Sequence, residues 1–369
     1  MRIERIEVVP LEVPLARTFQ GSYYSMSERA TLITRVHTSD GLVGETYNGD
    51  EIHTQVEIGR IITDELAPLL VGADPTMVEK CWETMLPVTF DILRDRRLVL
   101  MAMAAVDSAL WDLTGKAAGL PLYRLWGGAA EQLPIVAIGG YYGLSESELA
   151  AEVEEYLEMG IGGCKMKVGS ASPEEDARRF LAMRRAAGDE PFVLMADANQ
   201  GYTVDDAITF ARSVREHDLR WFEEPVRWMN ADKWMRDVRF QAGVRVAAGQ
   251  SELARADARR LMETGAIDVC NFDASWSGGP TEWRRVAGLA ASYGVEMAHH
   301  EEPQISAHLL ASVPHGTYVE VFHPDRDPIF WNLIANRSQI VDGFYRIPTG
   351  PGLGLQLDEA FIDRHRVDR

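Results

Sequence analysis

The chain has 369 residues, of which 46% are hydrophobic and 25% charged, and its formal net charge is −19. This composition excludes a disordered, collagenous or disulfide-rich protein, because the apolar content supports a large core and there are only 3 cysteines. A chain this acidic repels phosphate backbones, so we expect no nucleic-acid partner.

The first 125 residues predict a small α+β unit. Residues 1–13 and 30–43 have strand patterns, and Ser39-Asp40-Gly41 predicts a hairpin turn. Residues 54–70 and 98–116 have helical patterns, and Gly115 and Gly119 end the second. The start lacks the apolar region of a signal peptide, and no apolar run approaches the roughly 18 residues of a membrane span. With three scattered cysteines, this predicts a cytoplasmic protein without membrane attachment.

From Leu133 onward, short apolar strands alternate with amphipathic helices. The strands are predicted at residues 135–138, 164–168, 192–196, 221–224, 244–248, 267–272, 295–299 and 318–322. Helices are predicted between them, for example at residues 173–187, 204–217, 255–264 and 281–293. This alternation predicts a parallel (β/α) barrel at residues 126–330, followed by a C-terminal segment at 331–369. A doubly wound sheet is the alternative, but no GxGxxG motif supports a dinucleotide-binding fold.

Polar residues follow the predicted strands at the end where a barrel carries its chemistry. In chain order they are Lys165, Lys167, Asp197, Asn199, Glu223, Glu224, Gln250, Glu252, Asp273, His299, His300 and Glu320. Any one of them alone is explained as a helix cap or a solvated strand end. Burying the whole ordered set is costly unless its charges are paired or bind a metal. The set therefore predicts an active site.

The residue types within this set favour a metal ion and two facing bases. Asp197, Glu223 and an oxygen ligand from the fifth strand suit a hard cation such as Mg²⁺, which prefers oxygen. Side chains alternate along a strand, so Lys165 and Lys167 share one face. Lys167 and His300 could then act as bases on either side of a bound ligand. We expect one Mg²⁺ per subunit.

These residues resemble the enolase superfamily, and specifically its mandelate racemase subgroup. The resemblance covers nearly the whole chain and rests on residues 105–113, 121–128, 165–167, 195–199, 222–225, 271–273, 278–279, 305–310 and 351–354. It implies a modified (β/α)₇β barrel of the TIM type with an N-terminal α+β capping domain. It also implies that the C-terminal segment completes the cap, and that the protein forms a homo-oligomer, from dimer to octamer.

The resemblance also implies roles for individual residues. Lys167 is the second lysine of the family's K-x-K motif and would be a base. Asp273 and His300 would form a dyad that supplies the second base. His300 is preferred to His299 because it lies five residues before the family string that begins at Ile305. Glu320 falls where the family carries an acid near the substrate carboxylate.

Asp197 and Glu223 match the family's first two metal ligands, but the third position departs from the usual pattern. Most members have a glutamate there, and this chain has Gln250. An amide oxygen can bind Mg²⁺, and some acid-sugar dehydratases of the superfamily are similar in this respect. Glu252 is the alternative third ligand, although two residues further along it would lie in the loop.

The implied chemistry is removal of the proton next to a carboxylate, giving an enediolate that Mg²⁺ stabilises. We expect Lys165 to lower the pKa of Lys167 by like-charge repulsion, and Glu320, if protonated, to donate a hydrogen bond to the substrate. If His300 then protonates a departing β-hydroxyl, a sugar acid becomes a 2-keto-3-deoxy acid. We therefore expect a dehydratase, a lyase. A racemase or epimerase is the alternative, and a non-catalytic acid-binding protein is a third.

Substrate specificity is expected to come from the loops of the cap. One loop holds Phe19, Gln20, Tyr23 and Tyr24, and a second holds Tyr47, Asn48, Asp50 and Glu51. Tyrosine and amide side chains suit hydroxyl-rich ligands because they both donate and accept hydrogen bonds. Tyr23, Tyr24, Tyr47 and Asn199 are the substrate-binding candidates, with Trp276, Tyr141 and Tyr142 as further possibilities. Each alone is also explained as a solvated loop residue.

Overall fold

The computed structural model describes residues 1–49 and 52–367, so the predicted specificity residues Asp50 and Glu51 lie outside the described residues. The cap begins with an antiparallel sheet of β1 (Ile3–Gln20), β2 (Ser25–Thr38) and β3 (Val43–Tyr47). The predicted turn joins β2 to β3, and Gly41 takes a φ of 84° there, a value that favours glycine. β1 is longer than expected, so Phe19 and Gln20 belong to the strand rather than to a loop.

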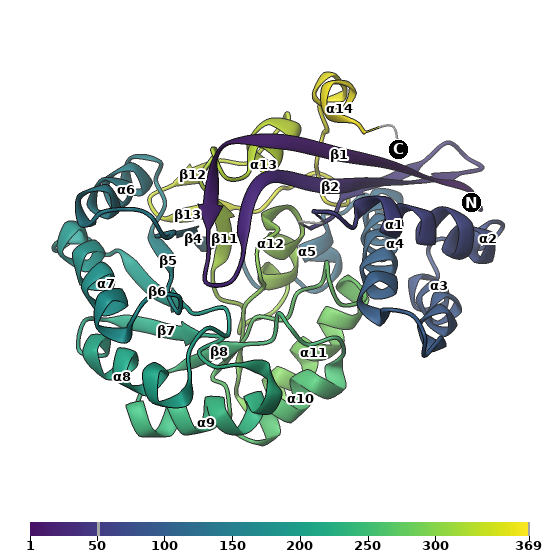
Figure 1. Cartoon of the computed structure of the whole chain (residues 1–369). Helices are drawn as coiled ribbons and strands as arrows, with labels where there is room; N and C mark the ends of the chain where they lie inside the picture. Colours follow the sequence, from purple (N-terminus) through teal and green to yellow (C-terminus); the bar gives the residue numbers. More distant parts are fainter. Residues whose placement is uncertain (50–51, 368–369) are drawn as a thin grey trace.

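Helices pack against this sheet on one side (Figure 1). They are α1 (Gln55–Arg60), the π-helical turn η1 (Ile61–Leu66), α2 (Ala67–Leu70), α3 (Val78–Met85), the 3₁₀ turn η2 (Leu86–Phe90) and α4 (Arg96–Ala118). A Cβ on Gly44 would lie 2.1 Å from the Ala109 carbonyl oxygen, so only glycine lets α4 approach β3 this closely. Within the described ranges, α4 alone is long and apolar enough to cross a membrane. However, 83% of its apolar window is buried inside the protein, as in a core helix.

Eight parallel strands follow the cap in chain order. They are β4 (Gln132–Gly139), β5 (Gly163–Lys167), β6 (Val193–Asp197), β7 (Leu219–Glu223), β8 (Val246–Ala248), β9 (Val269–Cys270), β10 (Glu296–Met297) and β11 (Val319–Phe322). Each pairs with the next from β4 to β10, and β11 pairs with β4. Between β10 and β11, Met297 bonds to the His315 carbonyl at 2.8 Å and to the Thr317 N–H at 2.9 Å. The return of β11 to β4 excludes a doubly wound sheet, and the predicted barrel is confirmed.

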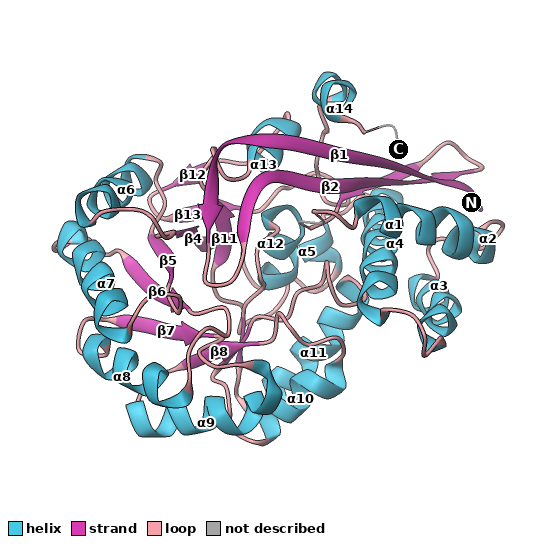
Figure 2. Ribbon diagram, in the orientation of Figure 1, coloured by secondary structure: helices cyan, strands magenta, loops and turns pink. Residues whose placement is uncertain are grey.

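Helices cover the outside of the barrel (Figure 2). They are α6 (Glu146–Glu158), α7 (Pro173–Ala187), α8 (Val204–Val214), the 3₁₀ turn η3 (Trp228–Asn230), α9 (Ala231–Ala242), α10 (Arg255–Glu263), α11 (Pro280–Tyr293) and α12 (Pro303–Ala311). The short α5 (Leu122–Leu125) connects the cap to the barrel. Capping side chains fix several of the starts; for example, Ser145 and Glu148 form a reciprocal capping box at α6.

The C-terminal segment contains α13 (Pro328–Leu333), β12 (Ile340–Val341), β13 (Phe344–Arg346) and α14 (Glu359–His365). Its first part contacts both domains, because α13 packs on β1 of the cap and β13 pairs antiparallel with the beginning of β4. Its last part returns to the cap: α14 packs on β1, and the Val367 N–H donates to the Pro10 carbonyl at 3.0 Å. The segment therefore ties the barrel to the cap.

The interior of the barrel has an apolar floor beneath the polar strand ends. Six buried residues form it: Val136, Met195, Trp221, Ala247, Val269 and Ala298. Met195 and Trp221 precede Asp197 and Glu223 by two residues, so each carboxylate shares a face with a floor residue. The Trp221 indole donates to Glu223 at 3.1 Å. The apolar residues therefore fill the lower part of the barrel interior, and the charged side chains lie directly above them toward the carboxyl ends of the strands.

Candidate active site

A cavity of about 260 Å³ lies at the carboxyl ends of the barrel strands. It is lined by Tyr24, Met26, Ile52, Lys167, Asn199, Gln250, Trp276, His300, Glu301 and Arg326. The end of the β1–β2 hairpin bends over the barrel at this point (Figure 1). The Ser22 hydroxyl, which bonds to the carbonyls of Val168 and Ala198 at 2.6 and 2.9 Å, fastens the hairpin to the ends of β5 and β6. The cap thus closes a site whose floor belongs to the barrel.

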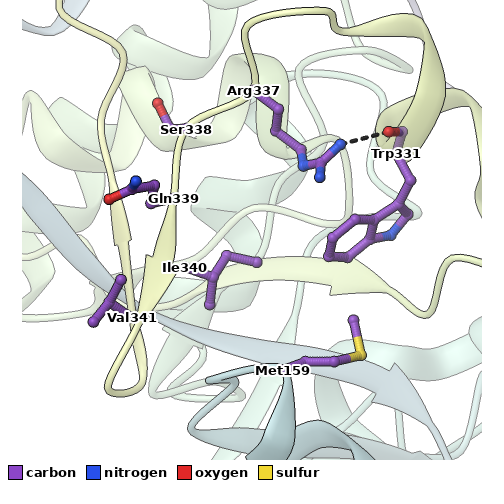
Figure 3. Close-up of a pocket in the computed structure, with 7 residues that line it drawn as sticks. All are labelled: Met159, Trp331, Arg337, Ser338, Gln339, Ile340 and Val341. Atoms are coloured by element: carbon purple, nitrogen blue, oxygen red, sulfur yellow. Dashed lines mark hydrogen bonds between the residues drawn. The ribbon is translucent and has the colours of Figure 1, made fainter.

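A larger hollow of about 530 Å³ lies beside β12, next to Met159 and Trp331 (Figure 3). Its cationic side chain, Arg337, lies over the Trp331 ring at 4.5 Å and donates to the Trp331 carbonyl. No carboxylate, histidine or lysine is among its lining residues. Because β13 joins the opposite end of β4 from the strand ends described above, this hollow is remote from the charged cluster.

Lys165 and Lys167 both point into the barrel, as the alternation along β5 predicts. Both are fully buried. Lys165 lies between two carboxylates, with its Nζ 2.7 Å from Glu223 Oε1 and 2.5 Å from Glu320 Oε1. Lys167 Nζ lies 2.7 Å from Asp197 Oδ2, and of the two lysines it is the one that lines the cavity. Lys167 is therefore placed to meet a ligand, and Lys165 is held beneath it.

The expectation that Lys165 lowers the pKa of Lys167 is wrong for this structure. Burial opposes the charged form of Lys167, but the Asp197 carboxylate outweighs it and holds the pKa of Lys167 well above its usual value. For Lys165, burial is likewise outweighed by Glu223 and Glu320, so its pKa is also raised. The carboxylates come from other strands and contact the lysine amines directly, at 2.5–2.7 Å.

The predicted metal-binding residues lie at adjacent strand ends. Asp197 and Glu223 are register partners on β6 and β7, and Gln250 follows β8 and lines the cavity. Asn271 Nδ2 lies 3.2 Å from Gln250 Oε1. Asn199 Oδ1, beside Asp197, is buried with no hydrogen-bond partner. This donor set consists of oxygens, which is what Mg²⁺ requires.

The described residues contain no group of three His, Cys, Asp or Glu side chains poised to hold a metal. The predicted set differs from such a group in having an amide as its third member and lysines against both carboxylates. Glu252 is not among the cavity-lining residues, whereas Gln250 is. Burial raises the pKa of Glu252 to about 7. The residues therefore fit a hard cation through two carboxylates and an amide oxygen.

His300 and Asp273 form the predicted pair. His300 Nδ1 lies 2.9 Å from Asp273 Oδ2, and the other Asp273 oxygen accepts from the N–H and hydroxyl of Ser275, each at 2.7 Å. The ring of His300 packs against Trp276 with centroids 4.8 Å apart. His299 faces away from the cavity: its ring lies between the Ala274 N–H and the His300 carbonyl. The structure therefore separates the two histidines as the alternation of faces predicts.

Glu320 on β11 has different contacts from those expected. Its Oε1 contacts Lys165 and its Oε2 accepts from the Glu301 N–H at 2.9 Å. In both contacts it is an acceptor. The expected role of a donor to substrate therefore has no support in this arrangement.

Some of the predicted substrate-binding residues line the cavity, and others do not. Tyr24 lines the cavity, with its ring centroid 5.8 Å from Lys167 Nζ, and Trp276 and Asn199 line it too. Tyr23 is 74% exposed and lies outside it. Tyr47 belongs to the hydrophobic core. Neither of these two reaches the cavity.

Tyr141 and Tyr142 also lie outside the cavity. Tyr141 is buried in a small apolar cluster with Phe19, and Tyr142 donates to Asp176 at 2.8 Å.

Four cavity residues escaped the sequence analysis: Met26, Ile52, Glu301 and Arg326. Met26 and Ile52 lie directly beyond the two predicted specificity loops, but as apolar residues they gave no signal of a polar ligand. Arg326 lies on a segment that only the fold brings to the barrel mouth. Glu301 had one, since it follows His300 directly. Arg326 and Glu301 give the cavity wall one positive and one negative charge.

Comparison with known proteins agrees with this geometry. Residues 5–127 match the family described as mandelate racemase / muconate lactonizing enzyme, N-terminal domain. Residues 148–361 match the family described as enolase C-terminal domain-like.

The chain belongs to the mandelate racemase subgroup of the enolase superfamily. Within this family, it is 32% identical over 366 residues to the 3,6-anhydro-alpha-L-galactonate cycloisomerase of Streptomyces coelicolor, covering 99% of each chain. It is 29% identical to the L-talarate/galactarate dehydratase of Salmonella typhimurium, covering 97% of this chain and 89% of the relative. The relatives are thus enzymes, and they include both lyases and isomerases.

Solved mandelate racemase relatives have the same fold. A mandelate racemase/muconate lactonizing enzyme that is 54% identical superposes with a TM-score of 0.97, covering 100% of both chains. A second, from a marine actinobacterium and solved in complex with magnesium, is 52% identical with a TM-score of 0.94, covering 100% of this chain and 99% of the other. The barrel and cap described above are therefore those of the family.

Proposed function

We propose that this protein is a Mg²⁺-dependent enzyme that removes the proton α to a carboxylate and then eliminates an oxygen substituent from the β carbon. Dehydration of a sugar acid to a 2-keto-3-deoxy acid is the reaction that the site supports best. The observation that supports this most strongly is that Lys167 and His300 line the same cavity, with His300 held from behind by Asp273. β4 and β11 separate their strands around the ring.

Asp197, Glu223 and Gln250 would hold the metal ion, and a relative that is 52% identical has been solved in complex with magnesium. When bound, the ion would polarise the substrate carboxylate and offset the carboxylate charge that now holds the lysines protonated. Asn199 and Tyr24, which both line the cavity, would contact the sugar hydroxyls. Arg326 adds a permanent positive charge at the wall, which suits an anionic substrate.

Lys167 and His300 would each carry out one of the two proton transfers. Lys167 Nζ would take the α proton, because it is the buried amine that faces the cavity. Asp273 holds Nδ1 of His300 at 2.9 Å, so Nε2, which lies 3.2 Å from Glu301 Oε1, is the ring nitrogen that would meet the substrate. Nε2 would give its proton to the departing β-oxygen. Water leaves, and the resulting enol becomes a keto acid.

A cycloisomerase is a second candidate, because the Streptomyces coelicolor relative has that name. In a 3,6-anhydro acid, the β-oxygen belongs to a ring, so the same elimination would open the ring without releasing water. The two acid-base groups serve either substrate. The two reactions differ in whether the leaving oxygen departs as water or stays bonded to another carbon of the same molecule.

A mass-spectrometric screen in D₂O tests the proposal. Purified protein with Mg²⁺ is incubated with aldonic acids, aldaric acids, anhydro acids and acid lactones. Loss of water from one acid supports a dehydratase, and a keto product of unchanged formula supports a cycloisomerase. Deuterium gain without a keto product would indicate a racemase or epimerase and would contradict the elimination.

Two variants complete the screen. His300→Asn should abolish product formation. His217→Asn, the same change at an exposed histidine, should not.

A further inference from the structure

Glu301 places a second carboxylate on the ring of His300. Its Oε1 lies 3.2 Å from His300 Nε2, the nitrogen that faces away from Asp273. Nδ1 of the same ring lies 2.9 Å from Asp273 Oδ2. Glu301 is 9% exposed and lines the cavity. Both ring nitrogens of His300 therefore face carboxylate oxygens.

The backbone around Glu301 is held in an unusual conformation. Glu301 and Glu302 have φ values of 56° and 53°, in the left-handed region that side chains rarely adopt. Glu302 is fixed by Arg29 Nη2 at 2.9 Å and by Gln304 Nε2 at 2.7 Å. The Glu301 N–H is fixed on Glu320 at 2.9 Å. Strained residues of this kind persist where the surroundings over-determine them, often at functional sites.

The positions of the two carboxylates favour a doubly protonated His300 ring. A neutral imidazole carries one N–H and would turn a lone pair toward one of the two carboxylates, whereas an imidazolium donates to both. Burial opposes the charge, but Glu301 and Asp273 outweigh it and raise the pKa of His300 well above its usual value. His300 in turn lowers the pKa of Glu301, with smaller contributions from Arg326 and Arg29, and the buried Glu224 carboxyl also interacts with the charge of His300. Burial holds His299 neutral by lowering its pKa.

We propose that Glu301 is a positioning residue that keeps His300 doubly protonated in the resting enzyme, so that His300 enters the reaction as an acid and not as a base. This inference rests on the proposed function and deepens it. Nε2 gives its proton to the departing oxygen, and the C–O bond breaks with its electron pair on that oxygen. Lys167 takes the α proton. Lys167 ends one proton richer and His300 one proton poorer, so the loss of water balances.

The inference also restricts the substrate. An acid whose α proton faces His300 would meet a group that has no free lone pair to accept it. Only an acid whose α proton faces Lys167 and whose β-oxygen faces His300 would react. A two-sided racemase, which needs either group to start as a base, is disfavoured by Glu301.

The test is ¹⁵N NMR of the full-length, Mg²⁺-loaded protein labelled at histidine, without substrate. His300→Asn identifies the His300 signals among the 9 histidines. In the wild type, the ring should remain an imidazolium above pH 7. In Glu301→Gln, the pH midpoint of its deprotonation should fall by at least about one unit, as expected for loss of an adjacent opposite charge. Glu301→Asp keeps the negative charge but moves it away from the ring, so its midpoint should lie between those of the wild type and Glu301→Gln.

Glu302→Gln is the matched control, because it changes the neighbouring glutamate, which has no contact with the His300 ring among those described. The exchange keeps the size of the side chain and alters only its contacts with Arg29 and Gln304. The His300 midpoint in this variant should match the wild type. A wild-type His300 that is neutral at pH 7, or an equal midpoint in Glu301→Gln, would overturn the proposal.

The wild-type measurement stands even if a variant fails to fold. Because no substrate is used, this result is independent of the screen that tests the proposed function.

Discussion

Replacing Asp273 by asparagine should remove most of the activity while leaving the fold intact. The carboxamide at position 273 can still accept from Ser275, whose N–H and hydroxyl lie 2.7 Å from Oδ1. Its NH₂ group would then face Nδ1 of His300, which donates to a carboxylate oxygen 2.9 Å away in the wild type. The change therefore removes a charge that supports the imidazolium and leaves a neutral ring with its one proton on Nε2, which is a much weaker acid toward the departing oxygen.

The size of the effect follows from this contact. An opposite charge at such a distance shifts a pKa by about 1–3 units, and each unit is about 1.4 kcal/mol. Because a neutral ring is a much weaker acid than an imidazolium, we expect kcat to fall by about 10²–10⁴-fold, the range for loss of general acid catalysis. Ser275→Ala, which removes one hydrogen bond worth about 0.5–1.5 kcal/mol, should lower kcat by no more than about tenfold.

The assay is keto-acid formation from the substrate that the screen identifies, with circular dichroism to verify folding. A folded Asp273→Asn variant within tenfold of wild-type kcat would refute the assigned role of the dyad.

Three further predictions concern the metal, the pH dependence of stability and the packing of the cap. Gln250→Glu adds a third carboxylate to the proposed metal site and should tighten Mg²⁺ binding by about tenfold in calorimetry; unchanged or weaker binding would argue against position 250 as a ligand. Burial lowers the pKa of His308 to about 4, and its ring accepts from the Tyr123 N–H and donates to the Leu353 carbonyl. Because the unfolded chain binds this proton near pH 6.5, the unfolded state gains stability as pH falls, and the free energy of unfolding should drop by up to about 3 kcal/mol between pH 6.5 and 4. Urea unfolding of His308→Gln should show a smaller drop over this range, and an equal drop would contradict the reasoning. Gly44→Ala should lower the melting temperature, because the added Cβ would lie 2.1 Å from the Ala109 carbonyl and such overpacking costs about 1–3 kcal/mol. Gly288→Ala, with nothing within 4 Å of the new methyl, should raise it; a stable Gly44→Ala variant would contradict the packing described.

The barrel and the polar strand ends could be predicted because both depend on short-range periodicity. Alternation along β5 places Lys165 and Lys167 on one face, and α7 (Pro173–Ala187) begins and ends where its pattern does. The pairing of His300 with Asp273 followed from the order of the strands and the family resemblance. In each case the structure depends on residues close in sequence or on a repeated topology.

The remaining features depend on contacts between distant segments. The position of the β1–β2 hairpin over the barrel is fixed by Ser22 on two carbonyls of other strands, so Tyr24 reached the cavity and Tyr23 did not. The charge state of the lysines depends on Asp197, Glu223 and Glu320, whose distances no local pattern encodes. Both features depend on tertiary contacts, so the sequence alone could not predict which tyrosine reaches the cavity or how strongly each carboxylate acts on the lysines.

The division of labour between Lys167 and His300 is the central claim, and hydrogen exchange in D₂O tests it most directly. The substrate is incubated with Mg²⁺ and either His300→Asn or Lys167→Met, and both α-deuterium incorporation and keto-acid formation are followed by NMR. The account predicts that His300→Asn exchanges the α proton without forming keto acid, and that Lys167→Met does neither. Keto acid from His300→Asn, or α exchange by Lys167→Met, would contradict it.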